Sequence, residues 1–193
     1  MANYIYKKLS WFVIIFSFFS FTCNNNIVSS SESSSIPNQK FNSANEGLCI
    51  YATKVDINSN LTYQNFDIEE ADLIGEPLVS YNQIISYDTS SHIITLSYSQ
   101  DSLKNKIGQI GVYGKPFIVT LDSQKIYGGW FWTPISSIPC HSVVIEPDDV
   151  FDTLKTNEIR IKLGYPDENQ FKGIDPRNNR VIIDRLIKDK KVK

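Results

Sequence analysis

The chain has 193 residues, of which 41% are hydrophobic, and this is enough for one domain with a substantial buried core. Its formal net charge is -2, so it lacks the basic surface with which proteins bind nucleic acids, and we predict no nucleic-acid partner. A mildly acidic balance is ordinary for a soluble domain and points to no other partner.

Residues 1–22 are typical of a bacterial export signal. Lys7 and Lys8 form a positively charged start, and residues 9–21 are apolar apart from three serines. This run is closer to the roughly 7–15 residues of a signal peptide's apolar core than to the roughly 20 residues that span a bilayer. We therefore predict a signal peptide, with an uncleaved membrane anchor as the alternative.

Cys23 follows the apolar run, and the chain turns polar at once with three asparagines. This arrangement resembles a bacterial lipoprotein signal, in which the cysteine is acylated and becomes the new N-terminus. Ser20 and Thr22 replace the leucine and the small residue of the usual pattern, as in the looser signals of Bacteroidetes-like bacteria. The resemblance implies a lipid anchor on Cys23, a membrane as partner and a location in the cell envelope, on a membrane and side that the sequence leaves open.

Residues 23–45 are rich in Ser and Asn and contain the run SSSESSS. Such a composition cannot bury enough apolar surface to offset the entropy that ordering would cost, so we predict a flexible tether. We expect residues 46–193 to form a single domain.

Alternating apolar and polar side chains predict strands within this domain. Between the first two strands lies an acidic segment, residues 66–75. We expect Glu76-Pro77 to mark a boundary after it, because a proline keeps the preceding residue out of the helical conformation. Gly128-Gly129 predicts a bulge or a close backbone approach within the fourth strand. The predicted strands are residues 46–56, 92–99, 116–121, 125–133, 142–146 and 157–163.

Two segments have the apolar spacing of helices. Residues 102–110 place three apolar side chains on one face, and we expect Gly111 and Gly114 to end this helix. Residues 180–188 have helical spacing and lead into a basic tail, which suits a helix C-terminus. We predict an α+β fold, in which a mainly antiparallel sheet contains a split β-α-β unit (β-α-β-β) and a C-terminal helix follows.

The run from Glu76-Pro77 through YNQIISYD and HIITL to GKPFIVTLD and KIYGGWFW resembles a module of the first periplasmic domain of the SecD translocon subunit. It is also similar to uncharacterised bacterial exported lipoproteins that share Gly-x-Pro-Phe-x-Val followed by Ile-Tyr-x-Gly-x-Phe. The resemblance covers about residues 76–146 and the C-terminal segment, residues 174–192, which is similar to the ending of those lipoproteins. It implies a fold and no catalytic residue, and no translocon function follows from it.

Cys49 and Cys140 are the cysteines of the predicted domain. In an oxidising envelope they form a disulfide or stay buried as free thiols. The dipeptide Cys140-His141 suggests a nucleophile and a base, but neighbours on an extended segment point in opposite directions, and His92 would serve as base only if the fold brought it near. The spacing of His and Cys fits no zinc site, so we predict no metal and no cofactor.

The densest aromatic cluster contains Tyr127, Trp130 and Trp132. On a strand, Tyr127 and Phe131 lie on one face and the two tryptophans on the other. One face must be core, and the other is either core as well or an exposed platform for carbohydrate or peptide.

Our principal hypothesis is a non-enzymatic envelope lipoprotein that binds or modulates a protein partner. The alternatives are a glycan-binding module that uses the aromatic strand and an envelope hydrolase built on Cys140 or the serines. A hydrolase needs a base, an orienting acid and an oxyanion site, and the sequence shows no such set.

Overall fold

The computed structural model describes residues 46–54, 66–148 and 152–193. The predicted signal peptide, Cys23 and the predicted tether lie outside these residues. In the described ranges, we find no helix that is both long enough and apolar enough to cross a membrane.

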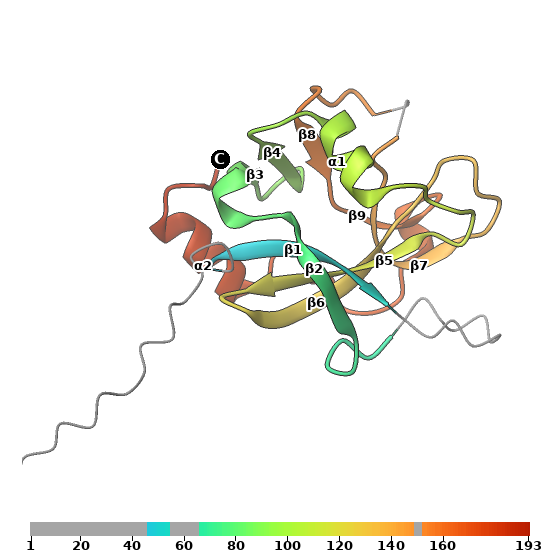
Figure 1. Cartoon of the computed structure of the whole chain (residues 1–193), viewed down its shortest axis with the longest axis horizontal. Helices are drawn as coiled ribbons and strands as arrows, with labels where there is room; N and C mark the ends of the chain where they lie inside the picture. The colour runs from blue at the N-terminus through green and yellow to red at the C-terminus, as the bar shows by residue number, and fades with distance from the viewer. Residues whose placement is uncertain (1–45, 55–65, 149–151) are drawn as a thin grey trace, which may run out of the picture. The chain divides into compact units, whose positions relative to one another are not determined.

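Two sheets form the framework of residues 46–193 (Figure 1). Neighbouring strands are antiparallel except β6 and β7, which are parallel. The larger sheet has the spatial order β2 (Asp72–Val79), β1 (Leu48–Lys54), β5 (Lys115–Leu121), β6 (Gln124–Phe131), β7 (Cys140–Ile145) and β9 (Lys162–Tyr165). The smaller sheet has the order β3 (Ile84–Asp88), β4 (Ile93–Leu96) and β8 (Glu158–Arg160).

Both helices begin at a polar cap. The Ser99 hydroxyl accepts a hydrogen bond from the Ser102 amide and starts α1 (Gln100–Ile107), which ends at Gly108 with φ +72°, three residues earlier than we predicted from Gly111. The Asn179 side chain accepts from the Val181 amide and starts α2 (Arg180–Lys188), whose bounds match the prediction.

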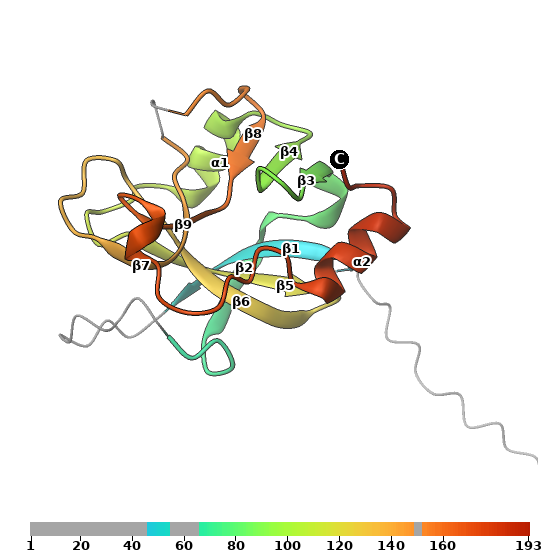
Figure 2. The ribbon, with the colours of Figure 1, turned by 180° about the vertical axis from the view of Figure 1, so that it is seen from behind.

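The main core lies on one face of the larger sheet. Apolar side chains of β1, β5, β6 and β7 pack there against the smaller sheet and against both helices. Figure 2 shows the smaller sheet and the helices from behind, beside the larger sheet. At its centre the rings of Phe117 and Phe131 lie 4.9 Å apart between centroids. Two helix positions anchor this layer, because Leu103 of α1 and Leu186 of α2 are fully buried.

The opposite face of the larger sheet is covered too. Trp130, Trp132, Cys140 and Val144 form a second buried cluster, against which Phe66 packs. The Phe66 and Trp130 rings meet edge to face at 5.9 Å, a favourable geometry for two aromatic side chains. The larger sheet is therefore buried on both faces around β6.

The predicted α+β class with mainly antiparallel sheets and a C-terminal helix is confirmed. The order strand, helix, strand, strand is present as β4, α1, β5 and β6, but β4 belongs to the smaller sheet, so the unit spans two sheets instead of one. The single strand predicted for residues 157–163 is two strands, since the chain leaves the smaller sheet after Arg160 and joins the larger at Lys162.

Glu76 is in a strand and not in a helix, as we predicted, but Pro77 marks no boundary, because β2 continues through it. It can do so because β2 is an edge strand, where a missing N–H leaves no neighbour unpaired. The glycine pair of β6 marks a close approach: a Cβ at Gly128 would lie 2.6 Å from the Phe66 ring. The ladder irregularity of β6 lies earlier, opposite Val119 and Thr120.

Candidate functional site

The aromatic residues proposed as a binding surface are buried. Trp130 and Trp132 have no exposed surface, and Tyr127 is 8% exposed. Tyr127 and Phe131 belong to the main core, while both tryptophans belong to the second cluster, as strand alternation predicted. The platform alternative is therefore wrong, and the interpretation in which both faces are core is confirmed.

Cys49 and Cys140 are buried thiols that are not joined, so the possible disulfide is absent. Cys49 lies on β1 and Cys140 on β7, and two strands separate them. Three strand spacings place the strands roughly 14 Å apart, which exceeds the roughly 7 Å Cα separation that a disulfide tolerates.

Cys140 is also a poor candidate nucleophile. Burial raises the pKa of Cys140 to about 12, so the thiol stays protonated near neutral pH. The neighbouring His141 Nδ1–H donates to the Gln170 carbonyl at 2.7 Å. His92 makes its contacts with Tyr87, in the main core, whereas Cys140 lies in the second cluster.

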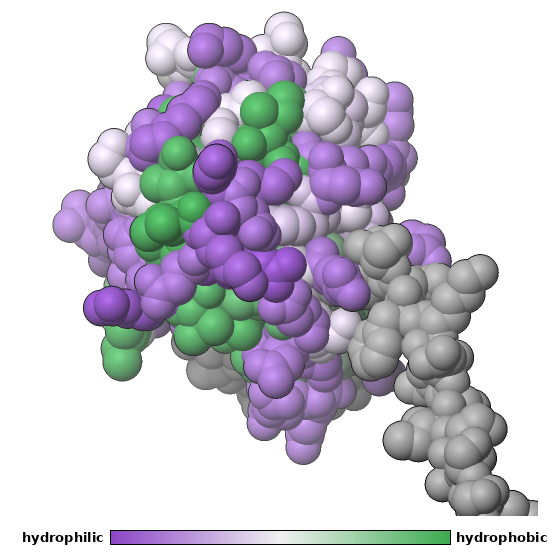
Figure 3. All heavy atoms as spheres, turned by 90° about the vertical axis from the view of Figure 1, so that its left-hand side faces the viewer, coloured by the Kyte–Doolittle hydropathy of each residue, from purple (hydrophilic) through white to green (hydrophobic). Residues whose placement is uncertain are grey.

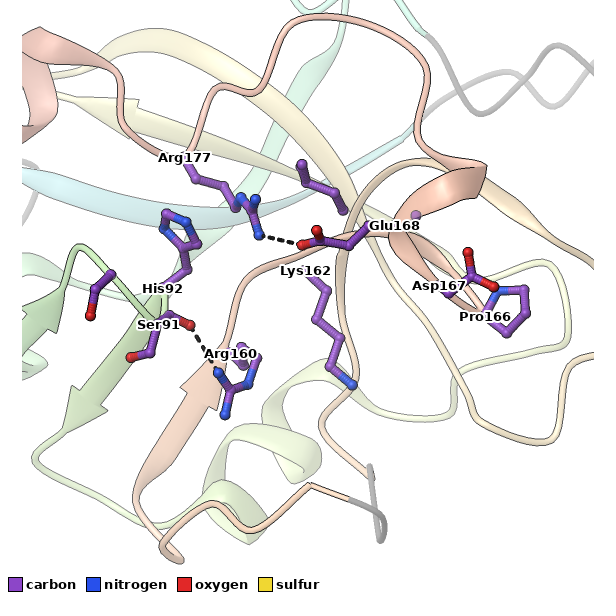
Figure 4. Close-up of a pocket in the computed structure, with 11 residues that line it drawn as sticks. Ser91, His92, Arg160, Lys162, Pro166, Asp167, Glu168 and Arg177 are labelled. Carbon is purple, nitrogen blue, oxygen red and sulfur yellow. Dashed lines mark hydrogen bonds and ion pairs between the residues drawn. The ribbon is translucent and has the colours of Figure 1, made fainter.

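The structure gathers charged side chains around a different place, a cavity of about 520 Å³ that we call the cleft (Figure 4). Four separate parts of the chain line it: the β3–β4 turn, β8, the stretch from β9 into the next turn, and the loop before α2. The residues that matter most are His92, Arg160, Lys162, Glu168 and Arg177. Among the described residues, no group of His, Cys, Asp and Glu could hold a metal ion.

His92 is held in one orientation by a hydrogen-bond relay. The Tyr87 hydroxyl lies 2.9 Å from His92 Nδ1 and 3.0 Å from the Arg177 carbonyl oxygen. Because a carbonyl only accepts, Tyr87 gives its single proton to Arg177, and the neutral His92 must donate from Nδ1–H to the Tyr87 oxygen. Nε2 of His92 then carries the lone pair, and it has no hydrogen-bond partner within the described part of the chain.

The turn that presents His92 has a defined local cause. Asp88 Oδ1 accepts from the amides of Ser90 and Ser91 and from the Ser90 hydroxyl, which fixes a tight turn after β3. His92 itself has φ +56°, a left-handed conformation that is uncommon for a residue with a side chain. Such backbone geometry persists where the surroundings enforce it, and here it directs the imidazole to the cleft.

Carboxylates fix the three cationic side chains of the cleft. Arg160 makes a bidentate pair with Asp152, at 2.7 and 3.1 Å. Lys162 Nζ donates to Glu146 at 2.9 Å. These pairs hold the cationic groups in fixed orientations.

Arg177 has the most buried of these cationic groups. Its side chain is 10% exposed, and its guanidinium reaches Asp175 at 2.9 Å and Glu168 at 3.1 Å. Figure 4 shows the Arg177 and Glu168 side chains meeting across the upper part of the cleft. The cations therefore act as positioned hydrogen-bond donors more than as bare charges.

A second cavity, of about 470 Å³, lies beside α2. Figure 3 shows this side of the protein, where apolar side chains form bands between hydrophilic ones. Among the described residues that line this cavity, one ion pair is present, between Arg180 and Asp184. Its atoms lie 3.5 Å apart and both side chains are exposed, so the pair holds neither group in a fixed position. The cleft at His92 is the better candidate site because its polar groups are held in place.

The free energy of unfolding should depend on pH through the titration of His92. Burial, and then the Arg177 charge, lower the pKa of His92 below its ordinary value, so the folded state binds fewer protons than the unfolded state between the two pKa values. The stabilising contribution is present above about pH 6.5 and is lost as the pH falls through the lowered pKa. Unfolding by urea should therefore become easier from pH 7.5 towards pH 5.

His92→Asn is the variant to compare, because Asn tolerates the left-handed conformation and does not titrate. We expect its free energy of unfolding to vary less with pH over this interval than that of the wild type. An identical pH dependence in the two proteins would show that His92 does not titrate differently in the folded state.

Comparisons with protein-family models, with curated proteins and with solved structures found no match.

Proposed function

We propose that this protein is a lipid-anchored protein of the bacterial cell envelope, attached through Cys23, and that its folded domain binds a small polar ligand in the cleft without transforming it. The resemblance of residues 1–23 to a lipoprotein signal supports the anchor. The observation that carries the binding role is the set of cationic side chains fixed by carboxylates around an oriented histidine.

The polar groups of the cleft define the ligand's chemistry. Arg160, Lys162 and Arg177 line it, together with the acids Asp167 and Glu168. With the carboxylates that pair with the three cations, Asp152, Glu146 and Asp175, the formal balance is -2 with His92 neutral, so the cations offer directed hydrogen-bond donors and not a net positive charge. A carboxylate or phosphate oxygen suits the guanidinium donors, and a hydroxyl or amine suits the Nε2 lone pair of His92. The ligand should therefore combine an acidic group with a hydrogen-bond donor, at a size that a cavity of about 520 Å³ admits.

Binding without catalysis is the simpler use of this arrangement. The hydroxyl nearest His92 along the chain belongs to Ser91, whose oxygen is buried, and Ser90 Oγ is bonded to Asp88. Nucleophilic catalysis needs a hydroxyl or thiol within hydrogen-bond reach of the base, and within the described part of the chain no hydroxyl or thiol bonds to Nε2, the basic nitrogen of His92.

Lactate is a minimal probe, because it carries one carboxylate and one hydroxyl. We expect it to shift the NMR signals of cleft residues in the ¹⁵N-labelled full chain in detergent micelles, with millimolar affinity. Propionate lacks the hydroxyl and lactamide lacks the charge. Each should therefore bind several-fold more weakly than lactate, because each loses about one hydrogen bond to the cleft.

Two variants make this test specific. His92→Asn should reduce lactate binding to the level of propionate, because the Nε2 acceptor is gone. Arg180→Gln, which removes a cation that is 89% exposed and lies outside the cleft, should leave binding unchanged. Equal shifts from all three probes would contradict a site with this selectivity.

The anchor is tested separately by the intact mass of the membrane-extracted protein. A mature chain that starts at Cys23 and carries acyl groups, and that loses both features in Cys23→Ala, would support it. A chain that keeps Met1 without acyl groups would contradict the lipoprotein assignment.

A further inference from the structure

Two neighbouring loops form an apolar end of the larger sheet, which we call the tip. It consists of residues 108–114, between α1 and β5, and residues 132–139, between β6 and β7. Figures 1 and 2 show these loops projecting side by side from the same end of the sheet. The Ser136 hydroxyl joins them, because it donates to the Val112 carbonyl at 2.7 Å.

The tip exposes large apolar side chains and carries no charged side chain. Ile135 is 81% exposed, Tyr113 is 54% exposed and Val112 is 44% exposed. Neither loop contains Asp, Glu, Lys or Arg, and no such residue occurs anywhere in residues 126–145. A solvated loop would ordinarily carry polar or charged side chains at its exposed positions.

The exposed side chains stand on an ordered backbone. The Tyr165 hydroxyl reaches the carbonyl oxygens of Pro134 and Ser136 at 2.9 and 3.1 Å, and Ser136 is itself buried. The Gly114 amide donates to the Gly111 carbonyl at 2.9 Å and closes the other loop. Because the backbone of both loops is already ordered, the exposed apolar side chains can enter an apolar environment without a further loss of backbone entropy.

Basic side chains lie next to the tip. Lys106 of α1 and Lys115 of β5 flank residues 108–114, and their ammonium groups donate to the backbone carbonyls of Leu78 and Ile107. Within the described residues we find no carboxylate paired with either lysine, and the Lys106 ammonium also lies 4.6 Å from the centroid of the Tyr98 ring. Positive charge beside the tip favours a surface that carries anionic headgroups.

We propose that the tip inserts into the surface of a lipid bilayer, with Tyr113 at the headgroup level and the lysines against anionic lipids. Apolar side chains beside an interfacial tyrosine and lysines match the chemistry of that boundary. The exposed side chains number three, which is few for a protein interface of about 800 Å² per partner. A few inserted side chains suffice for a domain whose chain is already attached to the same bilayer, because attachment makes the second contact intramolecular.

This inference rests on the proposed anchor, and the chain length permits both contacts. β1 begins at Leu48 opposite Leu121, the end of β5 that lies farthest from the tip. The seven residues of β5 span roughly 23 Å at about 3.3 Å each. The 22 residues between Cys23 and Glu46 could reach at most about 75 Å when extended, so the anchor and the tip can meet one membrane.

The test uses the full chain in vesicles of phosphatidylethanolamine and phosphatidylglycerol, with an environment-sensitive fluorophore on Ile135→Cys. Part of the lipid carries a spin label on its acyl chains, which quenches only fluorophores near the bilayer. Ile187→Cys is the matched control, because Ile187 is 57% exposed and lies on α2, away from the tip. We expect quenching at position 135 to exceed that at position 187 by about threefold or more, as interfacial insertion requires.

A second variant probes the apolar character of the tip. With the fluorophore on Val112→Cys, the added change Ile135→Asp should reduce quenching several-fold, because a carboxylate resists entry into the interface. If the protein floats with the vesicles but positions 135 and 187 are quenched alike, the inference is overturned and the anchor stands. If the protein does not float, the anchor fails, and with it this inference.

Discussion

Gly129→Ala should lower the free energy of unfolding by about 3 kcal/mol. A Cβ at position 129 would lie 2.5 Å from Phe117 Cζ and 2.8 Å from the Val143 carbonyl oxygen, both far inside normal contact distance. Phe117 has no exposed surface and packs against Phe131, so its ring has no space into which to move. Val143 is the residue that pairs with Gly129 in the parallel ladder of β6 and β7, so its carbonyl is fixed as well.

Urea unfolding of the full chain in detergent measures this loss, and Gly111→Ala is its control. A Cβ at Gly111 would meet nothing within 4 Å, so we expect a change within about 0.5 kcal/mol. Equal effects of the two substitutions would show that the close approach of β5, β6 and β7 at Gly129 is not tight.

The elements that the sequence predicted well are those whose signals are local. The alternation of Phe117, Val119 and Leu121 indicates β5 because the same residues that form the strand also face the main core. The bounds of α2 match because the Asn179 cap and the apolar spacing of residues 180–188 agree with each other.

The division of strands between two sheets could not be predicted in this way. Alternation indicates that a strand has a buried face, but it does not identify the neighbouring strand. β4 pairs with β8 through Ile94 and Ile159, which lie 65 residues apart in the sequence. The break at Ile161 has the same origin, because residues 157–163 alternate without interruption while their two halves join different sheets.

The cleft could be predicted least of all. Arg160 and Lys162 alternate with apolar residues on their segment, which by itself indicates a solvated strand face. Arg177 lies in a loop, and the sequence suggested no role for His92 except as a possible base for Cys140. These side chains form a site only in the folded chain. His92 and Arg177 lie 85 residues apart in the sequence, and both contact the Tyr87 hydroxyl. The one local signal was a histidine directly after the polar turn at Asp88.

Trp130→Ala should lower the free energy of unfolding by about 4 kcal/mol, because it removes a large side chain with no exposed surface from the second cluster. The neighbouring Phe66 ring, 5.9 Å away, would lose its edge-to-face partner. Replacing an exposed apolar residue should change the free energy of unfolding much less. For Ile135→Ala, at a position that is 81% exposed, we expect a change within about 0.5 kcal/mol.

Trp130→Ala and Ile135→Ala also distinguish the role of the second cluster from that of the tip. Trp130→Ala should act through folding and leave lactate binding by the remaining folded protein intact, because the second cluster lies outside the cleft. Ile135→Ala should leave folding intact and weaken only contact with lipid. If Trp130→Ala and the wild type had the same free energy of unfolding, the second cluster would contribute nothing measurable to stability. Burial of both faces of β6 predicts the opposite, and it leaves the cleft and the tip as the proposed sites of ligand binding and membrane contact.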